Sequence, residues 1–266
     1  MAAVSFQSVG QDQAVDIARG HLYSFLASTF SDPAGKHFDA ALDPGKQEVA
    51  AAAAALLAAE APRDASLGAG ERPPAGVALA PVVAALQAPR ALLIEEHQKV
   101  FGLLIGQTAP LNETEYCRST DAFFRAQQLA DIAGFYAAFG VERSADSRER
   151  VDHLSIELEF MAHLIEKELF AAGSADSSVR GKAAVCRDAQ RTFFEAHLMW
   201  WVPGFAALLR KGTATDLYRS LADSLAAFIT AERVRFGVAP NADLSSLSPR
   251  PSLKPEETME CGPICH

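Results

Sequence analysis

Apolar residues along this chain recur at helical spacing, and no stretch alternates strictly between apolar and polar positions over the length of a half-buried strand. The pattern predicts helices over residues 13–29, 45–60, 81–86, 89–101, 120–139, 152–172, 178–200, 204–211 and 215–236. Gly and Pro residues interrupt 62–76, so a loop is expected there. Residues 1–236 are therefore predicted to form one all-α domain, a single helical bundle.

Three further segments differ from the helices in composition. Residues 102–112 are apolar but contain Gly and Pro, which predicts an ordered loop against the core, of the kind that often lines a site. Residues 142–150 are charged and are the best candidate for a hinge. After residue 236 the chain becomes polar and rich in Pro and Ser, so residues 237–266 are expected to form a disordered or loosely attached tail.

Composition narrows the class of protein. The chain has 266 residues and a formal charge of -9, and it contains no cluster of Lys and Arg that could bind a phosphate backbone, so nucleic acid is not an expected partner. The longest apolar run, 50–59, is about half the length that a membrane span needs, and the first residues carry no basic export signal. Four sparse cysteines fit reduced thiols. We expect a cytoplasmic protein without membrane insertion.

The predicted helix 152–172 is the most informative part of the sequence. On a helical wheel Ser155, Glu159, Ala162 and Glu166 form one stripe, which is expected to face solvent, while apolar residues cover the remaining surface. The helix is therefore expected to be mostly buried.

Two ionisable residues of this helix lie on its buried side. His153 and Glu157 are four residues apart and can share a hydrogen bond or an ion pair. A buried carboxylate is costly unless it is paired. Either the two residues satisfy each other and tie neighbouring helices together, or they line an interior groove and present an acidic floor to a ligand. Asp152 is expected to be the N-cap or a first-turn acid of the helix.

Motifs for enzymatic chemistry are missing from the sequence. A di-iron bundle needs Glu-x-x-His on two helices, but the spacing from Glu159 to His163 is one residue too long and that from Glu195 to His197 one too short. There is no phosphate-binding loop, no Gly-x-Ser-x-Gly and no Cys-x-x-Cys. We therefore expect neither a cofactor nor an enzyme.

Three segments together resemble the TorD/DmsD/NarJ family of redox-enzyme maturation chaperones. They are Glu96-His97-x-x-Val100-Phe101-Gly102 with Pro110-x-x-Glu113-x-Glu115-Tyr116, then Asp152-His153-Leu154-x-x-Glu157-Leu158-x-Phe160-Met161, and finally the region from Phe194 through His197, Trp200 and Pro203 to Phe205. The second segment is the most specific. The Glu-Thr-Glu-Tyr string and the Cys-containing tail resemble sequences of the family branch that serves type II dimethyl sulfoxide reductase-like enzymes. Val151 stands where that family often has Pro, and Thr-Ala-Pro-Leu-Asn replaces an aromatic-rich loop.

The resemblance implies a single all-helical domain of the TorD/DmsD type that binds the twin-arginine signal peptide of a molybdenum oxidoreductase. Such a chaperone holds the catalytic subunit back from export until its cofactor is inserted, as a monomer or as a domain-swapped dimer. By the match, Asp152 and His153 correspond to positions implicated in recognition of the peptide. The bordering loop corresponds to Phe101, Gly102, Pro110 and Tyr116.

The chemistry of the peptide indicates what its receptor needs. Two guanidinium groups beside an apolar stretch require carboxylates at the edge of a hydrophobic groove. The charge could come from Asp152, Glu113, Glu115 and Glu157, and the apolar wall from Phe101, Leu103, Leu104, Phe160 and Trp200. His197 is interpreted as a core histidine whose polar atoms are satisfied.

The C-terminus supports a second hypothesis. Cys261, Cys265 and His266 lie within six residues and are weak candidates for a soft-metal site, although a fourth ligand is missing. The chain could then be a metal- or cofactor-handling protein that uses its tail. Deletion of residues 256–266 distinguishes the hypotheses, because the groove hypothesis predicts that peptide binding survives.

Overall fold

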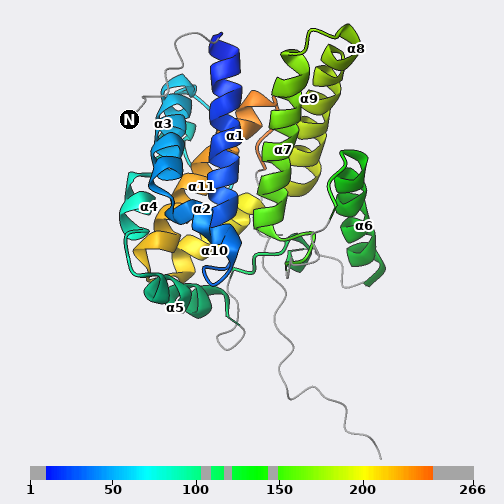
Figure 1. Cartoon of the computed structure of the whole chain (residues 1–266). Helices are drawn as coiled ribbons and strands as arrows, with labels where there is room; N and C mark the ends of the chain where they lie inside the picture. Colours follow the sequence, from blue (N-terminus) through cyan, green and yellow to red (C-terminus); the bar gives the residue numbers. More distant parts are fainter. Residues whose placement is uncertain (1–9, 103–108, 117–121, 143–148, 242–266) are drawn as a thin grey trace, which may run out of the picture.

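Helix α1 (Gln11–Thr29) lies at the centre of the bundle, between α3 (Pro44–Glu60) and α7 (Leu154–Ala172) (Figure 1). The computed structural model describes residues 10–102, 109–116, 122–142 and 149–241. On the far side of α7 packs α9 (Lys182–Phe193), and α10 (Val202–Gly212) packs on α11 (Asp216–Arg235). In these ranges the regular elements are all helical, which confirms the predicted all-α class.

Shorter elements connect the long helices. They are η2 (Lys36–Phe38), α2 (Asp39–Leu42), η3 (Pro74–Gly76), α4 (Ala80–Ala85), α5 (Arg90–Phe101), η4 (Glu113–Glu115), α6 (Ala122–Ala138), α8 (Ser177–Arg180) and the π-helical turn η5 (Phe194–Leu198). The expected helices are present to within a few residues, except that 178–200 is divided among α8, α9 and η5. The sequence pattern did not predict the short elements η2, α2, η3 and η4.

Local chemistry sets several helix ends. The side chain of Asp43 accepts a hydrogen bond from the Lys46 amide at 3.0 Å, and Pro44 occupies the first turn of α3. Thr215 caps α11 in the same way. After α11, Gly237 adopts a positive φ of 66°, a left-handed conformation that glycine adopts without steric cost and that commonly ends helices.

Of the four α7 residues predicted to face solvent, two do so. Glu159 and Glu166 are exposed, but Ser155 and Ala162 are buried at 7% and 8% exposure. Because α1 and α9 cover α7 from two sides, little of its surface is left for solvent. The expectation that this helix is mostly buried is confirmed.

A buried arginine joins three helices at a distance from α7's N-terminus. Arg19 of α1 donates two hydrogen bonds of 2.7 Å to Glu232 of α11, and further bonds to Asp16 and Gln190. Its side chain is 2% exposed, and Glu232 is equally buried. Such a pair holds α1 in register with α11 only while both partners are present.

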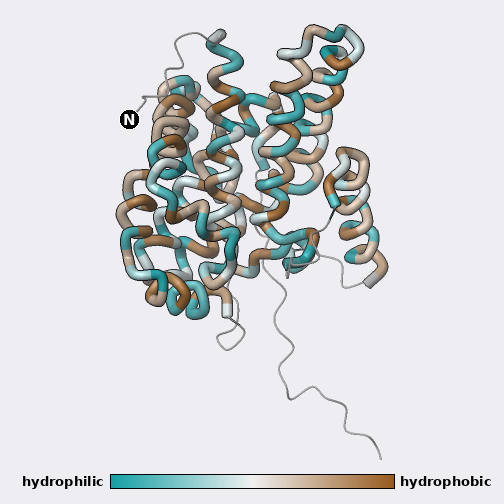
Figure 2. Tube along the Cα trace, viewed as in Figure 1, coloured by the Kyte–Doolittle hydropathy of each residue, from teal (hydrophilic) through white to brown (hydrophobic). Residues whose placement is uncertain are grey.

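Helix α6 lies at the margin of the bundle (Figure 1). Of residues 123–138 only Ile132 and Tyr136 are buried, although apolar residues occur along its whole length (Figure 2). The helix is held by these two side chains, by the half-buried Phe135, which packs on Phe193, and by η4, which it contacts.

Past α11 the chain stays attached to the body as far as it is described. The carbonyl of Asn241 accepts a hydrogen bond from the Ala69 amide at 2.8 Å, and that of Val238 accepts one from Arg233 at 3.0 Å. The domain boundary at residue 236 and the disorder of 237–266 stay predictions, and residues 242–266 lie outside the described part. None of the described helices combines the length and apolarity that crossing a membrane would need.

Candidate functional site

The N-terminal end of α7 is held against the loop that contains η4. Asn112 and His153 form an isolated antiparallel bridge, in which the Glu113 amide donates to the Asp152 carbonyl at 2.9 Å and the Leu154 amide donates to the Leu111 carbonyl at 2.8 Å. This contact brings together two of the three segments that carry the family resemblance. We call the polar residues around it the acidic junction: Asn112, Glu113, Thr114, Glu115, Arg125, Gln128, Arg150, Asp152, Glu157, His197 and Trp200.

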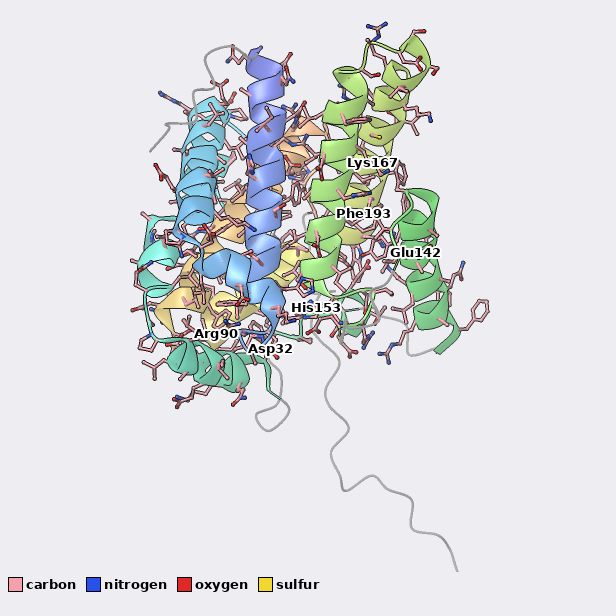
Figure 3. The ribbon with its side chains drawn as sticks, viewed as in Figure 1. Asp32, Arg90, Glu142, His153, Lys167 and Phe193 are labelled. Atoms are coloured by element: carbon pink, nitrogen blue, oxygen red, sulfur yellow. The ribbon has the colours of Figure 1, made fainter. Side chains whose placement is uncertain are left out.

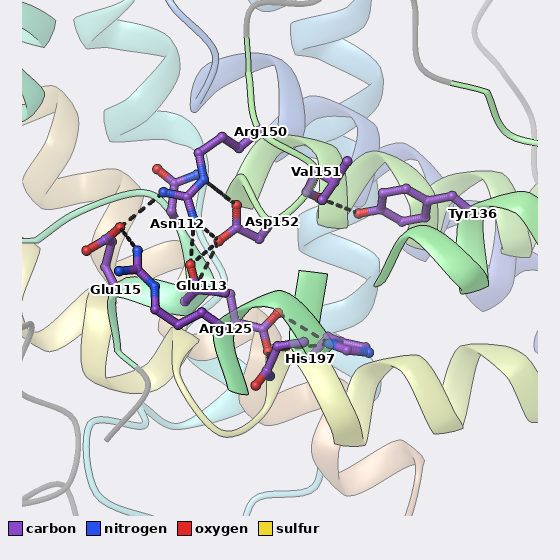
Figure 4. Close-up of polar contacts among 11 residues, drawn as sticks. Asn112, Glu113, Glu115, Arg125, Tyr136, Arg150, Val151, Asp152 and His197 are labelled. Carbon is purple, nitrogen blue, oxygen red and sulfur yellow. Dashed lines mark hydrogen bonds and ion pairs between the residues drawn. The ribbon is translucent and has the colours of Figure 1, made fainter. Parts of the chain in front are cut away.

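Asp152 is the fully buried centre of the acidic junction (Figure 4). Its carboxylate accepts hydrogen bonds from the Thr114 amide at 3.1 Å, the Thr114 hydroxyl at 2.8 Å and Asn112 at 3.3 Å. Arg150 adds two more, from Nε at 3.0 Å and from Nη2 at 2.8 Å. Asp152 therefore binds a guanidinium by the forked geometry that distinguishes Arg from Lys.

The outer edge of the acidic junction is exposed to solvent. Glu115 is 29% exposed and accepts hydrogen bonds from Arg125 at 3.0 Å and Arg150 at 3.1 Å. Arg150 itself is 42% exposed, although the Asp152 that it binds is completely covered. The guanidinium thus separates a buried carboxylate from solvent.

Glu113 is the inner carboxylate of the junction. Its side chain accepts hydrogen bonds of 2.7 Å from both the Trp200 indole and the Gln128 amide, and His197 Nδ1 lies 3.3 Å from it. The π-helical turn η5 adds a residue to the helical repeat just before Trp200, as its 2.9 Å bond from the Met199 amide to the Phe194 carbonyl indicates. His197 is buried, as expected of a core histidine, but its polar atoms are not both satisfied as predicted: among the described residues Nε2 makes no hydrogen bond and lies 3.3 Å from Asp131.

Glu157 is a second inner carboxyl group and is also fully buried. Burial raises its pKa well above the usual range, and the neighbouring Glu113 and Asp152 raise it further, while the Trp201 indole lowers it. Among the described residues neither Glu157 oxygen accepts a conventional hydrogen bond. The raised pKa favours a neutral Glu157.

His153 and Glu157 do not pair, contrary to one of the two sequence interpretations. His153 is the N-cap of α7: its Nδ1 contacts the Ser155 hydroxyl at 2.7 Å and accepts from the Ser155 amide at 3.3 Å. Its Nε2 lies 3.5 Å from Glu149. The i,i+4 rule fails here because His153 has extended backbone (φ -78°, ψ 135°) and lies outside the helix.

The expectation that Asp152 caps the helix or lies in its first turn is therefore also wrong, since His153 takes the cap. Burial, and then the nearby His97, lower the pKa of His153 to about 4. In Figure 3 His153 lies at the end of α7. Its imidazole is therefore neutral at neutral pH.

The remaining predicted site residues fall into two groups. Phe101, at the end of α5, packs its ring edge-on to Tyr218 at 5.0 Å and lies 5.1 Å from His97. Gly102 follows, and a Cβ there would collide with the carbonyl of Gln98. Both positions have a structural reason for their residue types.

In the second group, Tyr116 donates its hydroxyl proton to the Pro110 carbonyl at 2.9 Å and packs on Trp201 with ring centroids 5.1 Å apart. Both Pro110 and Tyr116 are buried. They fix the loop that carries Glu113 and Glu115, and Phe160 is buried beneath the same region against Tyr136.

Several predicted features lie outside the described residues. They are Leu103 and Leu104 of the apolar wall, most of the charged segment 142–150, and Cys261, Cys265 and His266 of the tail. Where side chains are described, no group of His, Cys, Asp and Glu could hold a metal ion.

Sequence reasoning missed Arg150, Thr114 and Asn112, which supply most hydrogen bonds to Asp152. Arg150 could have been noticed as a cation two residues before Asp152. The contribution of Thr114 and Asn112 depends on a contact between segments about 40 residues apart and leaves no local signal.

Comparison with known proteins gives one family and several relatives. The model of the family described as nitrate reductase delta subunit matches residues 69–207, slightly more than half of the chain. The selenate reductase assembly chaperone of Thauera selenatis is 36% identical over 110 residues, which cover 41% of this chain and 53% of that protein. The perchlorate reductase assembly chaperone of Dechloromonas aromatica is 34% identical over 103 residues, 39% of this chain and 44% of that protein.

A third relative is the chaperone protein TorD of Vibrio cholerae, 33% identical over 108 residues, which cover 41% of this chain and 45% of that protein. The chain thus spans about half the length of the curated relatives it matches.

Proposed function

Because the chain belongs to the nitrate reductase delta subunit family, which includes the TorD chaperones, we propose that it is a cytoplasmic assembly chaperone for a molybdenum oxidoreductase. It binds the twin-arginine signal peptide of the apo catalytic subunit and delays export until the cofactor is inserted. It does so without catalytic chemistry of its own, in keeping with relatives that are named chaperones.

The observation that supports this proposal best is the guanidinium site at Asp152. A completely buried carboxylate carries a forked guanidinium at a solvent-exposed edge, within the segment that most resembles the chaperone family. The partly exposed Glu115 adds a second carboxylate at this edge, where it accepts hydrogen bonds from Arg125 and Arg150. A peptide with two arginines finds here the geometry that it needs, and the formal charge of -9 favours its capture at low ionic strength.

Calorimetric titration of the full chain with two peptides tests the proposal. One carries Arg-Arg before an apolar stretch, and the other carries Lys-Lys in an identical sequence. We expect the Arg-Arg peptide to bind at least about tenfold more tightly, because an ammonium cannot form the fork. Equal binding of both peptides, or none, would contradict the proposal.

Two Glu→Gln variants, each of which removes one carboxylate charge with little change of shape, test whether the peptide binds at the acidic junction. Glu115→Gln is expected to weaken binding of the Arg-Arg peptide about three- to tenfold, because one exposed carboxylate contributes about 1 kcal/mol. The matched control is Glu166→Gln, since Glu166 is an exposed glutamate on α7 outside the acidic junction. If both variants bind like the original chain, the peptide binds elsewhere.

A further inference from the structure

Arg150 occupies the position in which an external guanidinium would bind. Its Nε and Nη2 reach the two oxygens of Asp152 at 3.0 and 2.8 Å, Nη2 also contacts the Thr114 hydroxyl, and Nη1 lies 3.1 Å from Glu115. Because Asp152 is 0% exposed beneath a side chain that is 42% exposed, no second guanidinium can reach it while Arg150 stays.

The binding site does not need the Arg150 side chain to keep its shape. The main chain beside it is fixed by other contacts: Tyr136 donates to the Val151 carbonyl at 2.9 Å, and the Glu113 amide donates to the Asp152 carbonyl at 2.9 Å. Thr114 donates to the Asp152 carboxylate from both its amide and its hydroxyl. Rotation of one exposed side chain would therefore leave a preformed acceptor for a guanidinium.

The acidic junction also has more carboxyl groups than cations. Behind Asp152 lies Glu157, which is fully buried and, within the described residues, has no cation within ion-pair distance and no hydrogen-bond donor to either oxygen. Glu115 keeps Arg125 as a partner at 3.0 Å whether or not Arg150 is present. An incoming arginine at Asp152 would thus take over the ion pair that Arg150 gives up, while Glu115 stays paired.

We propose that Arg150 is an internal ligand that occupies the guanidinium site, and that an arginine of the client's peptide binds by displacing it. The inference rests on the proposed function above and adds the step that controls it. Arg150 is covalently held two residues from Asp152, so it competes with any external ligand for Asp152 at high effective concentration. It therefore lowers the affinity of the site for every external guanidinium, and cations that cannot form the forked hydrogen bonds do not displace it.

Fluorescence anisotropy with a labelled Arg-Arg peptide tests the displacement. Arg150→Ala is expected to bind about tenfold more tightly than the original chain, which corresponds to about 1.4 kcal/mol. The matched control is Arg187→Ala, since Arg187 is likewise an exposed arginine, 65% exposed, on a buried carboxylate, Glu168. It removes the same charge but is expected to leave the peptide affinity unchanged.

A small probe separates site occupancy from a general charge effect. Millimolar methylguanidinium is expected to raise the melting temperature of Arg150→Ala, because it refills the vacated site, and to leave the original chain and Arg187→Ala unshifted. If Arg150→Ala does not fold, Arg150→Lys replaces it: it keeps the charge without the fork and should bind the peptide about threefold more tightly.

The results distinguish this inference from the proposed function. If the original chain prefers Arg-Arg over Lys-Lys but neither Arg150 variant binds more tightly, the displacement is refuted and the chaperone function stands. If neither the original chain nor a folded Arg150 variant binds the peptide, both the displacement by a client arginine and the proposed function are refuted. Tighter binding without a methylguanidinium shift also refutes occupancy of the site, since it would reflect charge alone.

Discussion

Replacing Glu157 by Gln is expected to remove a pH dependence from the stability of the fold. The buried carboxyl has a pKa raised well above its usual range, first by burial and then by Glu113 and Asp152. Gln has nearly the same shape as the protonated acid and stays neutral at all pH values. The substitution therefore isolates the cost of the titrating proton.

The sign follows from proton linkage. Above about pH 4.3, where an unfolded glutamate ionises, the folded chain still holds the Glu157 proton. The unfolded state then binds fewer protons than the folded state, so the free energy of unfolding falls as pH rises toward the folded pKa. One proton gives a slope of up to about 1.4 kcal/mol per pH unit. Glu157→Gln should lack this slope.

Urea unfolding, followed by far-ultraviolet circular dichroism at pH 5, 6, 7 and 8, measures the difference. We expect the variant to be within about 1 kcal/mol of the original chain at pH 5 and more stable than it at pH 7, by up to about 2.5 kcal/mol. Glu159→Gln, on the exposed side of α7, is the control and should leave the curve unchanged. Parallel curves for Glu157→Gln and the original chain would refute the assignment of a neutral buried acid.

Three further predictions test other parts of the account by the same unfolding measurement. Gly102→Ala should destabilise the fold by about 1 to 3 kcal/mol, because its Cβ would collide with the backbone of Gln98. Gly134→Ala, with open space around it on α6, should instead stabilise the fold by up to about 1 kcal/mol. Equal effects of the two variants would contradict the packing at Gly102. His153→Asn keeps a capping side chain but cannot be protonated. Because the folded pKa of about 4 lies below that of an unfolded histidine, the free energy of unfolding of the original chain should fall by on the order of 3 kcal/mol between pH 6.5 and pH 4, and that of the variant should not. Identical acid profiles of the two chains would refute this. Arg19→Met should lower the free energy of unfolding by about 3 to 5 kcal/mol, because it leaves the buried carboxylate of Glu232 unpaired. Adding Glu232→Leu removes that carboxylate and should restore most of the lost stability. A double variant no more stable than the single one would contradict that explanation.

Helical periodicity predicted the class and most helix positions because most of the long helices bury an apolar face; α6, in which only Ile132 and Tyr136 of residues 123–138 are buried, is an exception. It failed where the outcome depends on how many neighbours a helix has. Ser155 and Ala162 were assigned to solvent, although α1 and α9 leave little of α7 exposed. The periodicity also missed the break of 178–200 into α8, α9 and a π-helical turn, which lies just before Trp200, whose indole donates to Glu113.

The candidate site was predicted in composition but not in its connections. The carboxyl groups Asp152, Glu157, Glu113 and Glu115 do lie together, and the family motif indicated their region. The sequence could not show that Thr114 and Asn112 donate to Asp152, because those hydrogen bonds depend on the bridge between Asn112 and His153. Contacts between distant segments have no periodic signature.

Hydrogen–deuterium exchange of the full chain with the Arg-Arg peptide tests the central claim most directly. Our account predicts slower amide exchange in residues 109–116 and 149–157 when this peptide is bound, and no change with the Lys-Lys peptide at equal concentration. Protection confined to other segments, such as residues 242–266, or equal protection by both peptides, would contradict the claim that the acidic junction binds the twin arginines of a client.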